Sequence, residues 1–184
     1  MTLATSLPFA LEREAQQVAT DLNEATLRVV DRHEEIITEF PPLPYTTATL
    51  HEDATRAFNW TISQVTQLAQ TLFETGLITY PRTDSVRVAE EAIEAGKQVI
   101  TALYGKESLG HLVGENFPQP VETDSDLEAH EAIRPTSPNR HPDDLLEGNA
   151  EAHVLYRLIW ARFLASLMNP ARYRVITLAL EAEL

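Results

Sequence analysis

This chain of 184 residues has no cysteine, and its sequence holds no apolar run long enough to span a bilayer. The absence of cysteine excludes disulfides and thiolate metal sites, and it fits a cytoplasmic protein. The first residues lack the basic stretch and apolar core of a secretory leader, so we expect a cytoplasmic location. A chain of this length can bury a hydrophobic core and would ordinarily form one or two domains.

Positive charge is also scarce, because Lys97 and Lys106 are the only lysines and the formal net charge is −14. A free-standing nucleic-acid-binding domain usually presents a basic face, since neutralising phosphates releases counterions and provides affinity. We therefore expect this chain by itself to bind DNA weakly at physiological salt. Arg82, Arg87 and Arg134 can still form a local basic spot within an acidic surface.

The spacing of apolar residues predicts mostly helix. Helices are expected over about 9–23, 49–58, 62–75, 85–103 and 149–168, with a short helix around His130 that stops at Pro135. Strands are expected over 26–38 and near 176–180, where β-branched residues are frequent or apolar and other residues alternate. Because the strands flank the helices, we predict an α+β, mainly α fold in which a helical domain is inserted into a small β-rich arch made from both chain ends.

Several residues are candidates for helix ends. Thr49 and Glu52 have the spacing of a capping box, and Gly76 is placed to end the helix before it. Asp84 or Ser85 is the expected N-cap of the next helix. Asn149 is the candidate cap of the last long helix.

The segment with the clearest chemistry is Tyr80-Pro81-Arg82. Proline disfavours the helical conformation of the residue before it, and in an extended segment residues i and i+2 point to the same side. Tyr80 and Arg82 would then project into the same space. A phenolate is a competent nucleophile, a nearby cation favours the charged phenolate, and an arginine fork suits two phosphodiester oxygens. The pair is a candidate phosphoryl-transfer site.

Four blocks in collinear order resemble type IA DNA topoisomerases. Residues 76–85 (GLITYPRTDS) are similar to the motif of the catalytic tyrosine, and residues 129–136 (AHEAIRPT) to the histidine motif of that family. Residues 41–50 (PPLPYTTATL) resemble the entry to the tyrosine domain, and residues 155–166 resemble the helix that leads out of it. Residues 51–53 (HED) depart from the family, which has a glutamine-rich continuation there.

The resemblance implies an ATP-independent isomerase that relaxes supercoils by cutting and rejoining single-stranded DNA through a 5′-phosphotyrosine. It implies that Tyr80, Arg82 and His130 are catalytic, and that Arg82, Thr83, Asp84, Ser85 and Arg134 contact DNA. Arg134 could instead cap the loop after it. The family's Toprim domain, which holds Mg²⁺, and its next helical domain have no counterpart here. The chain is therefore expected to be a fragment without a metal site of its own, inactive without those partner domains.

The resemblance also implies three segments: residues 1–40 as the first part of the arch, 41–150 as the helical tyrosine domain, and 151–184 as the return helix and strand. The spacing His130-Glu131-x-x-Arg134 rejects the zinc pattern His-Glu-x-x-His, because arginine stands where the second histidine is needed. The alternative function is a non-catalytic DNA- or protein-binding module that keeps the fold. The acidic charge favours this alternative, and the intact Tyr-x-Arg motif speaks against it.

Overall fold

The computed structural model describes residues 11–110, 130–145 and 149–183, and divides the chain into two compact units. Unit 1 comprises Met1–Thr38 and Arg172–Leu184, and unit 2 comprises Glu39–Ala171. The α+β, mainly α fold predicted above is confirmed, with a helical part inserted between two terminal strands. The return helix falls in unit 2 by this division, whereas the sequence analysis grouped it with the arch; the domain boundaries at 40 and 150 stay predictions.

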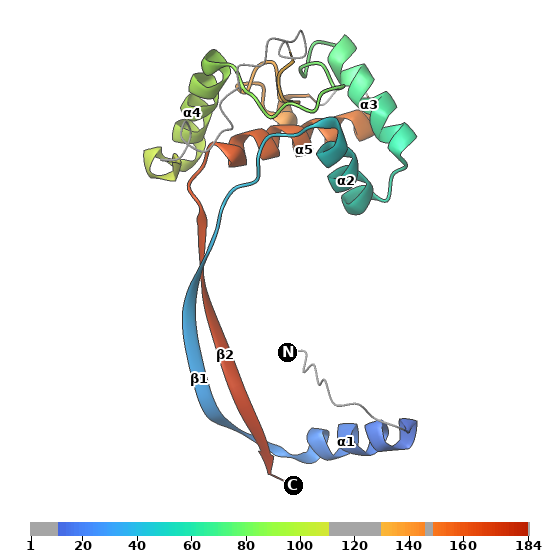
Figure 1. Ribbon diagram of the computed structural model, residues 1–184, viewed down its shortest axis with the longest axis vertical. Coiled ribbons are helices and arrows are strands. Elements are labelled where there is room, and N and C mark those ends of the chain that lie inside the picture. The colour runs from blue at the N-terminus through green and yellow to red at the C-terminus, as the bar shows by residue number, and fades with distance from the viewer. Residues whose placement is uncertain (1–10, 111–129, 146–148, 184) are drawn as a thin grey trace. The chain divides into compact units, whose positions relative to one another are not determined.

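Unit 1 consists of helix α1 (Glu12–Glu24) and the strands β1 (Thr26–Glu39) and β2 (Ala171–Glu183). The two strands pair as an antiparallel two-stranded sheet (Figure 1). Both strands were predicted, although β2 begins earlier than the expected 176. No residue of α1 or β1 is buried, and apolar side chains such as Val29 and Ile36 are 54% and 61% exposed.

Unit 2 is built around helix α5 (Ala150–Ser166), which α2 (Thr47–Phe58), α3 (Ile62–Glu74) and α4 (Glu90–Tyr104) contact. In Figure 1, α3 lies towards one end of α5 and α4 towards the other. Short 3₁₀ turns occupy Lys106–Ser108 and Pro142–Asp144. The core is formed by buried apolar side chains, and among its members that are at most 1% exposed are Tyr45, Leu50, Ile100, Leu155, Ile159 and Phe163.

The helices α2 and α3 each begin with a capping box. In α2 the cap is Thr46 with Thr49 as its partner, one turn before the pair expected from Thr49 and Glu52. The sequence prediction was therefore wrong in register, because a threonine hydroxyl can fill the partner position as well as a glutamate. In α3 the cap is Thr61, and its partner is Gln64.

Helix α4 starts later than predicted, at Glu90 and not after Asp84 or Ser85. Its first residue follows Ala89, whose side chain cannot cap. The preceding residues are held in extended backbone, because the Arg87 carbonyl accepts a hydrogen bond from the Ala132 amide at 2.8 Å. Tertiary pairing has replaced the local capping that Asp84 and Ser85 favour.

The short helix predicted around His130 is also absent from the described residues 130–145. Residues 130–135 are extended, and Ile133 and Pro135 form bridges with Tyr45 and Ile78. The backbone hydrogen bonds of this segment go to other segments, so a helical turn has no advantage here. By contrast, Asn149 caps α5 as predicted, since its side chain accepts from the amides of Glu151 and Ala152.

Candidate functional site

The segment that carries Tyr80 leaves the end of α3 at Gly76. Gly76 has a φ of +70°, a left-handed conformation that favours glycine. The Gly76 amide donates to the Phe73 carbonyl and the Leu77 amide to the Leu72 carbonyl, both at 2.8 Å. This is the Schellman pattern of helix termination. The tyrosine segment therefore starts from a helix end of fixed geometry, and the predicted role of Gly76 in ending α3 is confirmed.

Thr79 ties this segment to the residues that follow His130. Its amide donates to the Arg134 carbonyl at 3.0 Å, and its hydroxyl donates to the Ala132 carbonyl at 2.7 Å. The same hydroxyl accepts from the Arg134 amide at 3.0 Å. The motif of the tyrosine and the motif of the histidine are thus joined directly before Tyr80.

Thr47 holds the segment from the other side, at the first turn of α2. Its hydroxyl lies 2.7 Å from the Pro81 carbonyl oxygen and 3.0 Å from that of Thr83. The Thr83 amide donates to the Thr47 hydroxyl at 2.9 Å, and the Thr47 amide donates to the Thr83 carbonyl at 2.9 Å. The backbone on both sides of Arg82 is therefore fixed to a helix that packs on the core.

Tyr80 lies at the surface of unit 2 with two aromatic neighbours. Its side chain is 37% exposed. The ring of Phe73 meets it edge-on at a centroid distance of 5.4 Å, and the ring of His130 lies 5.4 Å away at an angle of 32°. Within the described ranges the Tyr80 hydroxyl forms no hydrogen bond. The structure thus brings Tyr80 and His130 together at the surface of unit 2.

Exposure alternates along the segment after Tyr80. Tyr80, Arg82 and Asp84 are exposed, whereas Pro81 and Thr83 are buried. Pro81 and Arg82 lie in a bend, and the alternation brings the three exposed side chains to the surface of unit 2. Arg82 forms no ion pair or hydrogen bond with any residue that the structure describes. Within the described residues the Arg82 guanidinium is therefore exposed and unpaired, two positions after Tyr80.

The predicted DNA contacts at Thr83 and Ser85 have internal partners. Thr83 is 7% exposed, and its hydroxyl accepts from the Ser85 amide at 3.0 Å. The Ser85 hydroxyl accepts from the Arg87 amide at 3.1 Å. Asp84 between them is exposed. Thr83 and Ser85 thus shape the turn after Arg82, and their contacts with DNA stay predictions.

Arg134 is engaged within its own loop. Its guanidinium donates to the Glu131 carboxylate through Nε at 2.9 Å and to the Pro135 carbonyl at 3.0 Å. The Arg134 side chain is only 12% exposed. The sequence left two roles open for Arg134. Its hydrogen bonds to Glu131 and Pro135 correspond to the capping of the loop, and its contact with DNA stays a prediction.

A second cluster secures the entry into unit 2. Tyr45 donates to the Asp53 carboxylate at 2.8 Å, and Arg162 donates to the same oxygen at 3.1 Å and to the Leu43 carbonyl at 2.6 Å. The Arg162 guanidinium also lies 4.6 Å from the centre of the Tyr45 ring. Burial, followed by the Asp53 carboxylate, raises the pKa of Tyr45 far above its usual range. Asp53 belongs to residues 51–53, where this sequence departs from the family. Its carboxylate has two hydrogen-bonding partners within unit 2, Tyr45 and Arg162.

The sequence analysis missed Thr47, Thr79 and Phe73 as neighbours of the tyrosine. Thr79 sits in the same motif as Tyr80, so its proximity was available from the sequence. Thr47 and Phe73 come from other segments, and only the fold brings them to Tyr80. A single sequence gives no signal for such pairs.

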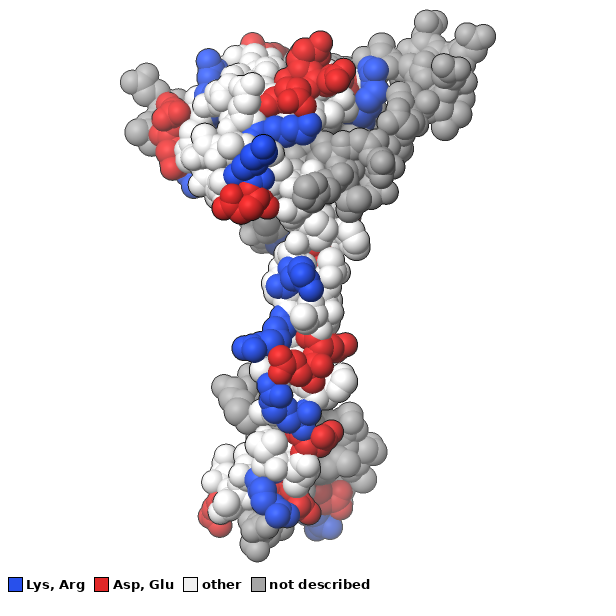
Figure 2. Space-filling view, turned by 90° about the vertical axis from the view of Figure 1, so that its left-hand side faces the viewer, with Lys and Arg blue, Asp and Glu red and all other residues white. Residues whose placement is uncertain are grey.

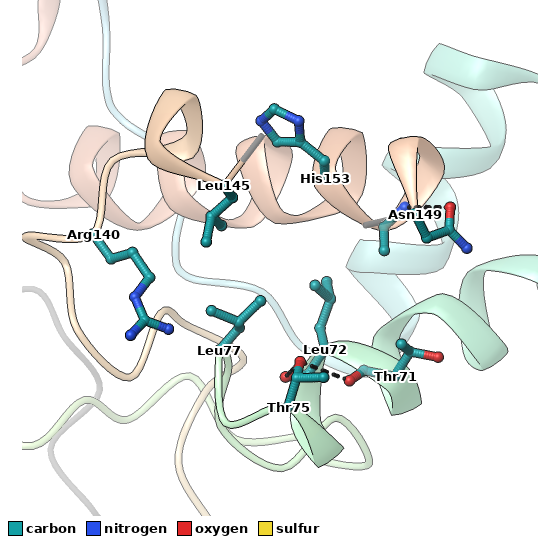
Figure 3. Close-up of a pocket in the computed structure, with 9 residues that line it drawn as sticks. Thr71, Leu72, Thr75, Leu77, Arg140, Leu145, Asn149 and His153 are labelled. Atoms are coloured by element: carbon teal, nitrogen blue, oxygen red, sulfur yellow. Dashed lines mark hydrogen bonds between the residues drawn. The ribbon is translucent and has the colours of Figure 1, made fainter. Parts of the chain in front are cut away.

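A cavity of about 300 Å³ lies between α3 and the start of α5. Leu72, Leu77 and Leu145 point towards one another across it, with Arg140 and His153 at its margin (Figure 3). The cavity is lined mainly by apolar atoms, and none of the predicted catalytic residues contributes to it. It is separate from the candidate site at Tyr80.

Charged side chains of both signs are distributed over the described surface (Figure 2). Figure 2 shows Lys and Arg interspersed with Asp and Glu on the face it presents, without one large basic field. Residues 11–110, 130–145 and 149–183 contain no group of three side chains fit to hold a metal ion. The pair Asp124 and Asp126, which has the spacing of a metal motif, lies outside the described residues.

Comparison with known proteins gives one consistent family. A family model described as DNA topoisomerase matches residues 4–184. DNA topoisomerase 1 of Vibrio cholerae is 37% identical over 172 residues, which cover 93% of this chain and 19% of that protein. DNA topoisomerase 1 of Escherichia coli is 35% identical over 177 residues, covering 95% and 20%.

A solved structure gives the same result. Full-length topoisomerase I of Thermotoga maritima superimposes with a TM-score of 0.71 and 31% identity, over 90% of this chain and 27% of that one. The chain thus spans about a fifth of the length of the curated relatives it matches. In the described residues no helix is long and apolar enough to cross a membrane.

Proposed function

This chain belongs to the DNA topoisomerase family, and we propose that it is the tyrosine-bearing segment of a type IA enzyme. In this proposal it cleaves and rejoins single-stranded DNA, without ATP, as part of a longer polypeptide in the cytoplasm. The observation that carries the proposal is the exposed Tyr80, whose hydroxyl forms no hydrogen bond within the described residues, with an exposed Arg82 two residues on and His130 beside its ring.

The reaction exchanges one phosphodiester for another. The Tyr80 oxygen attacks the scissile phosphorus, the bond from phosphorus to the 3′ oxygen breaks, and a 5′-phosphotyrosine forms. The phenol loses its proton and the leaving 3′ oxygen gains one. Rejoining is the reverse, in which the 3′ hydroxyl attacks the phosphotyrosine. The bond energy is kept in the enzyme, so no external energy source is needed.

Arg82 has the role of binding the scissile phosphate. Two oxygens of a phosphodiester match the guanidinium fork, and the charge that develops on them in the transition state is stabilised by it. His130 orients the Tyr80 ring or takes up its proton, because its own ring lies 5.4 Å away. Arg82→Lys should therefore slow cleavage, since lysine cannot reproduce the bidentate contact.

Magnesium belongs to the missing Toprim domain in this proposal. The described residues of the chain offer no three-ligand cluster, so no residue here is assigned to the ion. It follows that the isolated chain should be inactive. It also follows that activity should return only when the amino-terminal part is supplied.

The proposal is tested by mixing this chain with that amino-terminal part, Mg²⁺ and single-stranded DNA labelled at its 3′ end. The 3′ label stays with the fragment that becomes bound to the tyrosine. A covalent protein–DNA adduct should form with the natural chain and disappear with Tyr80→Phe. Tyr104→Phe, which alters a tyrosine that is 49% exposed on α4, is the matched control and should leave the adduct unchanged. An adduct undiminished in Tyr80→Phe would refute the proposal.

A second candidate function is a binding module that keeps the fold without cleaving DNA. It is favoured by the net charge of −14 and by the engagement of Arg134 with Glu131. In that case the mixture described above would bind DNA or protein. It would form no covalent adduct under conditions in which the related topoisomerases form one.

A further inference from the structure

We propose that Thr47 is a positioning residue for strand cleavage: its hydroxyl sets the backbone on both sides of Arg82 and thereby the placement of Arg82 relative to Tyr80. This inference rests on the function proposed above and extends it to a residue that lies 33 positions before the tyrosine in the sequence. Thr47 does not touch the reacting atoms in this account. It acts through Pro81 and Thr83.

The contacts of one hydroxyl carry the inference. The Thr47 oxygen lies 2.7 Å from the Pro81 carbonyl oxygen, 3.0 Å from the Thr83 carbonyl oxygen and 2.9 Å from the Thr83 nitrogen. Its single hydrogen is shared between the two carbonyls, while a lone pair accepts the Thr83 amide. The Pro81 carbonyl and the Thr83 amide belong to the two peptide groups that flank Arg82, and the Thr83 carbonyl belongs to the next one, so the hydroxyl constrains the backbone there.

The anchor itself is rigid. Thr47 is the first residue of α2 and lies between Thr46 and Thr49, which form the capping box. The helix buries Leu50 and Ala54 in the core, with exposures of 1% and 0%. A β-branched side chain has few rotamers in a helix, so the hydroxyl has little freedom of its own. Together with Pro81, whose ring fixes φ, this leaves the segment few ways to move.

The two ends of the Tyr80 segment are held differently. On the amino-terminal side Thr79 bonds to Ala132 and Arg134 through backbone and side chain. On the carboxyl-terminal side Thr47 supplies the contacts to Pro81, and its amide adds one to Thr83. Loss of the Thr47 hydroxyl would therefore free the Arg82 side of the pair while Tyr80 stays in place. Catalysis depends steeply on such alignment, because small displacements of a reacting group slow the chemical step.

The test uses the full-length polypeptide proposed above and follows cleavage of 3′-labelled single-stranded DNA in a single turnover. Thr47→Val keeps the shape of the side chain but has no hydroxyl. It should slow the cleavage step about 10- to 100-fold. The DNA concentration for half-maximal rate should change no more than about twofold, since Arg82 is still present. Thr47→Ser, which retains the hydroxyl, should restore the rate to within about threefold of the natural protein.

Thr49→Val is the control for stability. It removes the capping-box partner on the same helix turn but has no contact with the Tyr80 segment. If Thr49→Val lowers the unfolding temperature as much as Thr47→Val yet cleaves at the natural rate, the loss in Thr47→Val comes from positioning. Equal loss of rate in both variants would overturn the inference, as would a natural cleavage rate in Thr47→Val.

Two further outcomes are distinguishable. If the natural protein forms no covalent adduct with DNA, the proposed function itself is refuted. If it forms the adduct and only the Thr47 variants behave otherwise than expected, the inference about Thr47 is refuted. If Thr47→Val does not fold, Thr47→Cys replaces it under the same criteria, because a thiol of similar size forms only weak hydrogen bonds. A Thr47→Cys protein that is folded and cleaves like the natural one would overturn the inference.

Discussion

The two units of this chain differ in how they are held together. Unit 2 buries a continuous set of apolar side chains between α2, α3, α4 and α5. In unit 1, no residue of α1 or β1 is buried. Two paired strands alone are only marginally stable in water. The difference teaches that the candidate site, which lies entirely in unit 2, takes its geometry from a core that this chain supplies by itself. Equivalent substitutions should therefore have unequal effects in the two units.

The largest effect is expected from truncating the core of unit 2. Leu155 in α5 is 0% exposed, and Leu155→Ala should lower the free energy of unfolding by about 2–5 kcal/mol, because it leaves a cavity. Val29→Ala in β1, where the side chain is 54% exposed, should change it by about 0.5 kcal/mol or less. Urea unfolding followed by tryptophan fluorescence measures the loss in Leu155→Ala, since Trp60 and Trp160 both lie in unit 2. Hydrogen exchange of the β1 and β2 amides measures the change in Val29→Ala. Equal losses would contradict the comparison.

The next effect concerns ion pairs. Asp53→Ala removes the acceptor shared by Tyr45 and Arg162, whose side chain is 19% exposed, and should cost about 2–3 kcal/mol. Glu181→Ala breaks the pair with Arg28 in unit 1, where both side chains are more than half exposed, and should cost about 0–1 kcal/mol. Chemical denaturation of the two variants measures both changes in the free energy of unfolding. A costly Glu181→Ala would show that unit 1 is held more firmly than its exposure indicates.

A smaller loss is expected where α4 meets α5. A Cβ on Gly96 would lie 2.5 Å from Leu167 Cδ1 and 3.0 Å from Phe163 Cε1. Gly96→Ala should therefore destabilise unit 2 by about 1–2 kcal/mol, although alanine is the better helix former. Adding Leu167→Val should make the double variant less unstable than the sum of the single losses, because it makes room for the new methyl group. Simple additivity would show that the two residues do not meet.

The smallest effect is a change of stability with pH. Burial raises the pKa of Tyr156 to about 12, and it raises that of Tyr45 as well. A raised pKa means that the folded state holds its proton more tightly than the unfolded state, whose tyrosines titrate near 10. This stabilisation is complete below about pH 10 and is lost as the pH rises towards 12. Thermal unfolding between pH 8 and pH 11 should show the decline, and Tyr156→Phe should make it shallower. A decline of equal slope in that variant would exclude Tyr156 as a source.

Periodicity was sufficient for much of unit 2. The apolar spacing in α3 is strong, Gly76 has a conformation that glycine favours, and Asn149 caps α5, the helix that follows it. Such signals are local, so one sequence is enough to interpret them. The candidate nucleophile could also be inferred from the sequence, because proline between Tyr80 and Arg82 limits the backbone.

The errors share a different cause. Residues 130–135 are extended because their amides and carbonyls pair with Tyr45, Thr79 and Arg87, which are far away in the sequence. The same pairing displaces the start of α4 from Ser85 to Glu90. Thr47 was missed for the same reason, since nothing around it indicates a partner at 81–83. Contacts between distant segments are decided by the assembled core, which local spacing does not encode.

The antiparallel pairing of β1 and β2 has a consequence for how this lobe can be exchanged. The chain enters unit 2 at the end of one strand and leaves it at the start of its neighbour, so the entrance and the exit adjoin. Unit 2 is connected to unit 1 only through β1 and β2. A recombinant that carries unit 2 of another protein therefore needs compatible junctions at this one pair of strands. Chimaeras between distant relatives could thus exchange unit 2 at these two adjacent strand positions.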